Sequence, residues 1–168
     1  GADRILEQIN LTARRDLPAG VLAYAEQRAL EIGITIAGGA DVIMLDEPTS
    51  ALDVSVQKQV LNLLSDLQLK HGLSYLFISH DLGVIRHICD RVSVMYLGQI
   101  AEYGPTESIF TPPYHPYTEA LLSAVPIPDP TVEQIHIRLA GVVPSAINPP
   151  QGCRFNTRCP RRNLLPEP

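Results

Sequence analysis

The sequence predicts an α/β fold, in which a parallel sheet is flanked by helices and a loop-rich extension follows. Two short apolar runs, Val42–Leu45 and Leu73–Ile78, each have the length of a strand. The amphipathic stretch Val54–Lys70 lies between them, and a crossover of more than a dozen residues joins parallel strands. Because both runs are almost wholly apolar, we expect strands buried on both faces and helices on both sides of the sheet.

The remaining elements follow from the same kinds of pattern. Residues 3–15 read as a polar helix end, and apolar residues then recur at helical spacing from Leu22 to about Ile36. A short helix is expected over Leu82–Ile88. It is followed by a hairpin of Arg91–Tyr96 and Ile100–Tyr103 around a glycine turn.

The last part of the chain differs in composition. Residues 126–168 contain nine of the 15 prolines, which predicts a loop-rich extension with little core of its own. We therefore place one domain at 1–125 and the extension at 126–168. The chain starts with Gly1 and not with Met, which suggests a fragment.

Composition and charge argue against several classes of protein. The formal net charge of −5 provides no basic surface for a nucleic acid. The longest apolar candidate for a membrane span, Ala40–Leu45, has the length of a strand and contains Asp41. Three cysteines, Cys89, Cys153 and Cys159, form no even disulfide framework, so we expect a reducing cytoplasm.

Two adjacent acids, Asp46 and Glu47, follow the first predicted strand. The carboxyl edge of a parallel sheet is where ligands bind in open α/β folds. Adjacent carboxylates repel each other, and a divalent cation with its bound water relieves that repulsion. Asp46 can hold Mg²⁺ through water, and Glu47 can deprotonate a water that attacks a γ-phosphate. The alternative is a strand that ends in two solvated acids.

A histidine follows the second predicted strand. Because the two strands are expected to be parallel neighbours, His80 should emerge at the same sheet edge as Glu47. An imidazole there can hydrogen-bond both a γ-phosphate oxygen and the attacking water. We therefore predict that Asp46, Glu47 and His80 surround one centre for metal and nucleotide.

With these residues in place, the sequence resembles the ABC-type ATPases, from about Leu22 to Ala124. LDEPTSALD resembles their Walker B strand and D-loop, and ISHD resembles their switch-histidine loop. The resemblance implies a P-loop NTPase-like fold with ATP and Mg²⁺ as ligands. It implies that Asp46 is the Mg²⁺-associated aspartate, Glu47 the catalytic glutamate and His80 the γ-phosphate sensor.

The same resemblance implies partners. Ser50 to Asp53 would be the D-loop, which crosses the interface of a head-to-tail pair of ATPase subunits. That pair would dock on membrane permeases at the cytoplasmic face of the cell membrane. An extracytoplasmic substrate-binding protein would act indirectly, and no nucleic acid would be bound.

The signature motif of this family, usually LSGGQ, would lie at Leu22–Glu26. The serine and glycine amides of that motif cradle the γ-phosphate held by the opposite subunit, and a helix N-terminus suits an anion. Ala23 replaces the serine here, and Tyr24 and Ala25 replace the glycines. The backbone amides remain, and we expect the bulk of Tyr24 to alter the approach of phosphate. The alternative is a plain helix start.

Two stretches resemble different branches of the family. Leu22 to Asp46 resembles the importers of branched-chain amino acids. The chain from Ser50 onward resembles the dipeptide and oligopeptide importers, whose relatives carry nickel. A divergent protein and a joining of two gene fragments would both produce this mixture. Some members of the peptide branch bind an iron–sulfur cluster, but only Cys153 and Cys159 occur here and a cluster normally needs four thiolates.

One family motif does not occur in these residues. The 168 residues contain no GxxxxGK[ST] loop, whose amides and lysine grip the β- and γ-phosphates. We expect the chain as given to bind ATP poorly, and its full-length parent to hydrolyse ATP for import of peptides or nickel. The alternatives are a branched-chain amino acid importer ATPase, a soluble ABC ATPase and a non-catalytic fragment.

Overall fold

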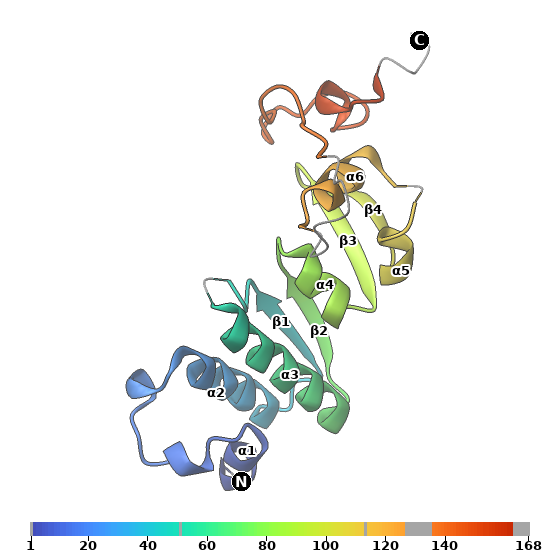
Figure 1. Ribbon diagram of the computed structural model, residues 1–168. Helices are drawn as coiled ribbons and strands as arrows, with labels where there is room; N and C mark the ends of the chain where they lie inside the picture. Colours follow the sequence, from blue (N-terminus) through green and yellow to red (C-terminus); the bar gives the residue numbers. More distant parts are fainter. Residues whose placement is uncertain (1, 51, 113, 127–135, 163–168) are drawn as a thin grey trace. The chain divides into compact units, whose positions relative to one another are not determined.

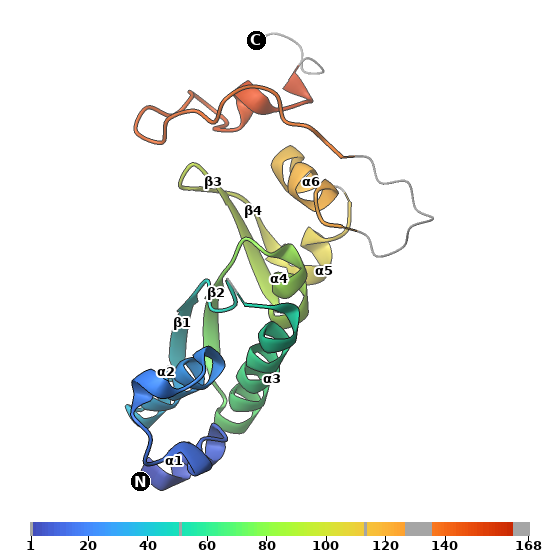
Figure 2. The ribbon, with the colours of Figure 1, turned by 60° about the vertical axis from the view of Figure 1, so that its left-hand side comes forward.

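The structure is a computed structural model that describes residues 2–50, 52–112, 114–126 and 136–162 (Figures 1 and 2). The chain divides into two compact units, Gly1–Asp81 and Leu82–Pro168. The domain boundary expected at 125/126 stays a prediction. Ala51 of the expected D-loop and residues 127–135 and 163–168 of the expected extension lie outside the described residues.

The first unit is built around a parallel strand pair. β1 (Val42–Asp46) pairs with β2 (Ser74–Ile78) in a register that runs from Val42 opposite Ser74 to Asp46 opposite Ile78. The crossover between them is α3 (Val54–His71), which buries an apolar stripe of Val60, Leu61, Leu64 and Leu67. The predicted parallel β–α–β order is therefore confirmed, with α3 one residue longer than expected.

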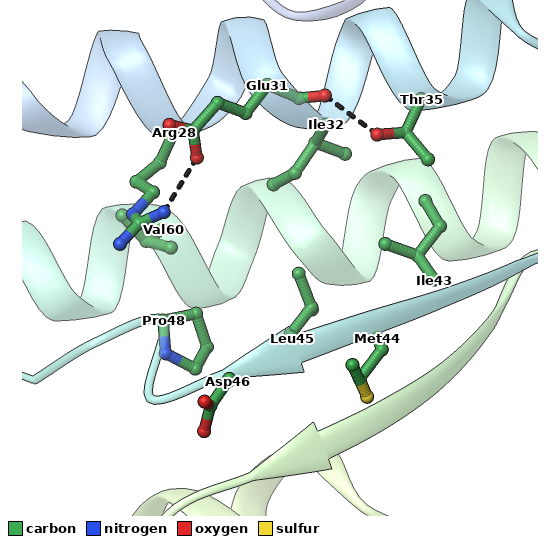
Figure 3. Close-up of a pocket in the computed structure, with 10 residues that line it drawn as sticks. All are labelled: Arg28, Glu31, Ile32, Thr35, Ile43, Met44, Leu45, Asp46, Pro48 and Val60. Carbon is green, nitrogen blue, oxygen red and sulfur yellow. Dashed lines mark hydrogen bonds and ion pairs between the residues drawn. The ribbon is translucent and has the colours of Figure 1, made fainter.

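The prediction that both strands are buried on both faces is wrong for this sheet. Ile43 and Leu45 point toward α2 (Tyr24–Ala37) and α3 and are buried, whereas Met44 points away from the helices (Figure 3). Val42 and Met44 are each 66% exposed, and Leu76 and Ile78 are also exposed. The reason is that both helices cover the same face of this strand pair, and no described element of the first unit covers the other face.

The N-terminal residues form a shorter helix than the one expected over 3–15. α1 (Ala2–Gln8) ends where Asn10 takes a left-handed conformation, with φ 59°, and a 3-10 turn over Thr12–Arg14 follows. α1 packs closely on α2, because a Cβ added at Gly33 would lie 3.1 Å from Cγ2 of Ile5. A second 3-10 turn, Ala19–Val21, leads toward α2.

The second unit contains the predicted hairpin. It opens with α4 (Leu82–Ile88), followed by the antiparallel pair β3 (Arg91–Tyr96) and β4 (Gln99–Pro105). Leu97 and Gly98 connect the strands with φ of 47° and 74°, as a tight hairpin turn with two left-handed residues requires. β4 extends two residues beyond the predicted end of the hairpin.

The C-terminal extension takes part in the core of the second unit. α5 (Thr106–Ile109) and α6 (Pro116–Ser123) follow the hairpin, and the described part of the extension forms one 3-10 turn, Asn156–Arg158. Phe155 is only 1% exposed, and its ring lies 5.2 Å from that of Tyr96 and 5.3 Å from that of Tyr117. The described part of the extension is loop-rich, and Phe155 packs into the core of the second unit against residues that precede the extension.

Candidate functional site

The two parallel strands end together and present their following residues at one edge. Asp46, the last residue of β1, lies opposite Ile78, the last residue of β2. The ladder continues for one more bond, since the backbone N–H of Glu47 donates to the carbonyl oxygen of Ile78 at 2.9 Å. Glu47 and His80 therefore leave the sheet at the same level.

Glu47 and His80 form a direct contact at this edge. Oε1 of Glu47 lies 2.9 Å from Nδ1 of His80. The hydrogen bond to Glu47, and then the negative charge of Glu47, raise the pKa of His80 above its ordinary value. The His80 side chain is 80% exposed and that of Glu47 is 35% exposed, so water reaches the pair. Because Nδ1 is engaged, Nε2 is the ring nitrogen that can meet a ligand.

The backbone at Glu47 is strained, and Ser50 holds it with two hydrogen bonds. Its φ of 46° lies in the left-handed region, which a residue with a side chain adopts at a cost of order 1–3 kcal/mol. Ser50 donates to the carbonyl oxygen of Glu47 twice, from its backbone N–H at 3.1 Å and from its hydroxyl at 2.8 Å. Ser50 therefore fixes the turn that aims the Glu47 carboxylate.

Asp46 faces a different direction from its neighbour. Strand alternation places its exposed side chain on the open face of β1 with Met44, away from the helices (Figure 3). Among the residues that the structure describes, no group of three or more His, Cys, Asp or Glu side chains is arranged to hold a metal ion. An exposed carboxylate of this kind fits Mg²⁺ held mainly by water and ligand oxygens, with Asp46 as one partner.

Asp53 has a defined local role. Its carboxylate accepts a hydrogen bond from the backbone N–H of Val56 at 2.9 Å and so caps the N-terminus of α3. The side chain is otherwise exposed. The expected contact of Ser50 to Asp53 with a second subunit stays a prediction.

The expected signature segment lies at the start of α2, as predicted. Leu22 is buried, and Ala23 occupies the N-cap position. Oε2 of Glu26 accepts from the backbone N–H of Ala23 at 2.9 Å, and Oε1 of Glu26 accepts from Nε of Arg14 at 3.0 Å. A glutamate three residues after a helix cap is a sequence signal for the first bond. No local pattern predicts the second bond, because Arg14 lies twelve residues away.

Tyr24 is tied to the side of its own helix. Its hydroxyl accepts from Nε of Arg28 at 3.0 Å and from Nη2 at 2.7 Å, and the guanidinium carbon lies 5.1 Å from the ring centroid. Ala25 follows as a half-buried residue. The expected effect of Tyr24 on phosphate approach stays a prediction, but its ring is held along α2 by Arg28.

A pocket of about 210 Å³ is lined mainly by residues of α2 and β1 (Figure 3). Its rim carries an ion pair between Arg28 and Glu31 at 2.7 Å, and Thr35 donates to the carbonyl oxygen of Glu31. Of the predicted site residues, only Asp46 lines it. Its ten lining residues are Arg28, Glu31, Ile32, Thr35, Ile43, Met44, Leu45, Asp46, Pro48 and Val60.

The three cysteines differ in their exposure to solvent. Cys153 is exposed and Cys159 is half-buried in the extension. Burial raises the pKa of the Cys89 thiol, which lies just after α4 and is half-buried.

Within the described ranges, no helix is both long and apolar enough to cross a membrane.

The matching family model and two of the matching curated proteins are named for dipeptide or oligopeptide transport. Residues 101–163 match the family model "Oligopeptide/dipeptide transporter, C-terminal region". The dipeptide transport ATP-binding protein DppF of Haemophilus influenzae is 61% identical over 119 residues, or 71% of this chain and 36% of the relative. DppF of Escherichia coli is 59% identical over 73% of this chain and 36% of the relative.

One relative spans both stretches that resemble different branches. A peptide import ATP-binding protein of Brucella ovis is 48% identical over 165 residues, which is 95% of this chain. That match covers 50% of the Brucella protein, so the chain spans about a third to a half of the length of these curated relatives.

Solved structures agree with the sequence relatives. An inward-facing metal-chelate type ABC transporter matches 74% of this chain and 48% of its own chain, with a TM-score of 0.64 and 28% identity. The ADP conformation of MJ1267, an ATP-binding cassette of an ABC transporter, matches 70% of this chain and 48% of its own, with a TM-score of 0.62 and 26% identity. Over most of its length the chain is therefore similar to ABC transporter ATP-binding proteins, and the sequence relatives named above are ATP-binding proteins of dipeptide and peptide transport.

Proposed function

We propose that the protein carrying these residues hydrolyses ATP and that this hydrolysis powers the import of peptides. The observation that carries the proposal is the 2.9 Å contact between Glu47 and His80 at the shared end of two parallel strands. The names of the dipeptide and peptide transport relatives support the substrate class. Nickel import is the alternative that the resemblance leaves within the same branch.

In this proposal Glu47 is the general base. Its carboxylate is exposed enough to meet a water molecule, and Ser50 fixes the turn that carries it. Glu47 accepts the proton of the water that attacks the γ-phosphate. His80 holds the carboxylate through Nδ1 and presents Nε2 toward the phosphate. Bound Mg²⁺ would supply charge neutralisation on the phosphates, with Asp46 as its partner through water.

The remaining assignments concern binding and partners. Leu22 to Glu26 would face the nucleotide of a second ATPase subunit, and Ser50 and Asp53 would lie near the same interface. We propose permease subunits as further partners, with the protein at the cytoplasmic face of the membrane. The pair Cys153 and Cys159 does not by itself supply the four thiolates of an iron–sulfur cluster.

The test is replacement of the proposed base. Because the 168 residues contain no phosphate-binding loop, the experiment uses the longer protein in which these residues and such a loop occur together. Glu47→Gln should lower the rate of ATP hydrolysis by about 10²–10⁴-fold while nucleotide binding is retained. Glu31→Gln removes the same charge from an exposed ion pair on α2 and should leave the rate unchanged. An unaltered rate in Glu47→Gln would remove Glu47 from this role.

A further inference from the structure

We propose that Glu26 is a built-in competitor of phosphate at the start of α2, so that this segment binds a nucleotide phosphate more weakly than a glutamine-bearing one. The inference rests on the proposed function, because that function assigns Leu22 to Glu26 to phosphate binding. It adds a residue that sets the strength of that binding.

The carboxylate of Glu26 already accepts two hydrogen bonds from donors near the start of α2. It accepts the backbone N–H of Ala23 at 2.9 Å and the Nε–H of Arg14 at 3.0 Å, one on each oxygen. The Glu26 side chain is 27% exposed, and the Arg14 side chain is 52% exposed. The hydrogen bond from Ala23, and then that from Arg14, lower the pKa of Glu26, so the group is ionised near neutral pH.

A helix N-terminus attracts negative charge through its unpaired N–H groups and its dipole. Here the negatively charged carboxylate of Glu26 already accepts a hydrogen bond from the backbone N–H of Ala23 at this helix N-terminus. An incoming phosphate would have to approach beside this carboxylate, and it would compete with it for Arg14. Each effect weakens phosphate binding without changing the backbone path.

The family's usual LSGGQ form carries glutamine at the position of Glu26. A glutamine side chain can accept the same N–H of Ala23 through its amide oxygen, so it keeps the cap and removes the charge. Comparing wild type with Glu26→Gln therefore tests the effect of the negative charge while the hydrogen bond to Ala23 is kept. It also separates the proposal from a purely structural role, because helix capping alone predicts no change in phosphate binding.

The experiment titrates inorganic phosphate into the ¹⁵N-labelled 168-residue chain and follows the amide signals of Ala23, Tyr24 and Ala25. Three chains are compared, namely wild type, Glu26→Gln and Glu31→Gln. Glu26→Gln should bind phosphate roughly five-fold more tightly than wild type, because the carboxylate and the phosphate carry like charges that repel each other. Circular dichroism checks that α2 is retained in each variant.

Glu31→Gln is the matched control, because it removes one carboxylate from the same helix five residues away. It should titrate as wild type does. Equal affinity in wild type and Glu26→Gln overturns the proposal, and so does an equal gain in Glu31→Gln, which would reflect net charge alone. Phosphate-induced shifts in none of the three chains also overturn it. None of these outcomes depends on Glu47, so hydrolysis by the longer protein tests the proposed function separately.

Discussion

At the scale of single residues, the contact between Glu47 and His80 sets the charge of the candidate site. The two residues lie 33 positions apart and touch because their strands end in register. The raised pKa of His80 means that the folded chain binds this proton more tightly than the unfolded chain does. The favourable contribution is complete below the ordinary histidine pKa of about 6.5, and it is lost as the pH rises through the folded value.

The contact with Glu47 predicts how the pKa of His80 changes when Glu47 is replaced. Glu47→Gln should return the pKa of His80 toward the ordinary value, because the hydrogen bond to a charged carboxylate is its largest cause. A pH titration of the His80 ring signals by NMR measures the change. Glu31→Gln should leave the titration where it is in the wild type. If the His80 curve is the same in wild type and Glu47→Gln, the two side chains do not interact in solution.

At the scale of elements, α3 joins the two parallel strands, and each end of this helix has a defined cap. Asp53 begins the helix by accepting from the N–H of Val56, and Gly72 ends it in a left-handed conformation with φ 66°. Between these ends, Leu64 and Leu67 are at most 1% exposed and form part of the unit's core. The capped start of α3 therefore follows three residues after Ser50, which holds the turn at Glu47.

The cap can be tested without touching the core. Asp53→Ala should lower the free energy of unfolding of the Gly1–Asp81 unit by about 1 kcal/mol, because the N–H of Val56 loses its acceptor. Amide hydrogen exchange along α3 measures the change, and Asp53→Asn should restore most of it. Asp66→Ala, at an exposed mid-helix position, should change the free energy by no more than about 0.5 kcal/mol. Equal protection in Asp53→Ala and wild type would mean that the cap contributes nothing.

At the scale of the whole chain, the described part of the C-terminal extension packs within the Leu82–Pro168 unit. Phe155 packs against Tyr96 and Tyr117, and Arg154 donates to the carbonyl oxygen of Leu97 in the hairpin turn. Arg161 also pairs with Glu119 on α6. The matched family region, 101–163, runs from β4 through this packing.

Removing the Phe155 ring should therefore destabilise the hairpin. Phe155→Ala should lower the free energy of unfolding of this unit by about 3–5 kcal/mol, since the ring is almost fully buried. Hydrogen exchange of the amides in β3 and β4 measures the loss. Val142→Ala, at a side chain that is 89% exposed, should change the same quantity by less than about 0.5 kcal/mol. Unchanged exchange in Phe155→Ala would show that the hairpin does not depend on the extension.

The sequence alone determined the order of elements and the edge at which Glu47 and His80 lie, because apolar periodicity and crossover length fix local structure and strand direction. It could not determine which faces of the strands are covered, since Met44 and Leu45 are equally apolar and only the positions of α2 and α3 distinguish them. Nor could it supply the contact of Arg14 with Glu26 or that of Phe155 with Tyr96. Those pairs lie far apart in sequence, and only the folded backbone brings their side chains within bonding or packing distance.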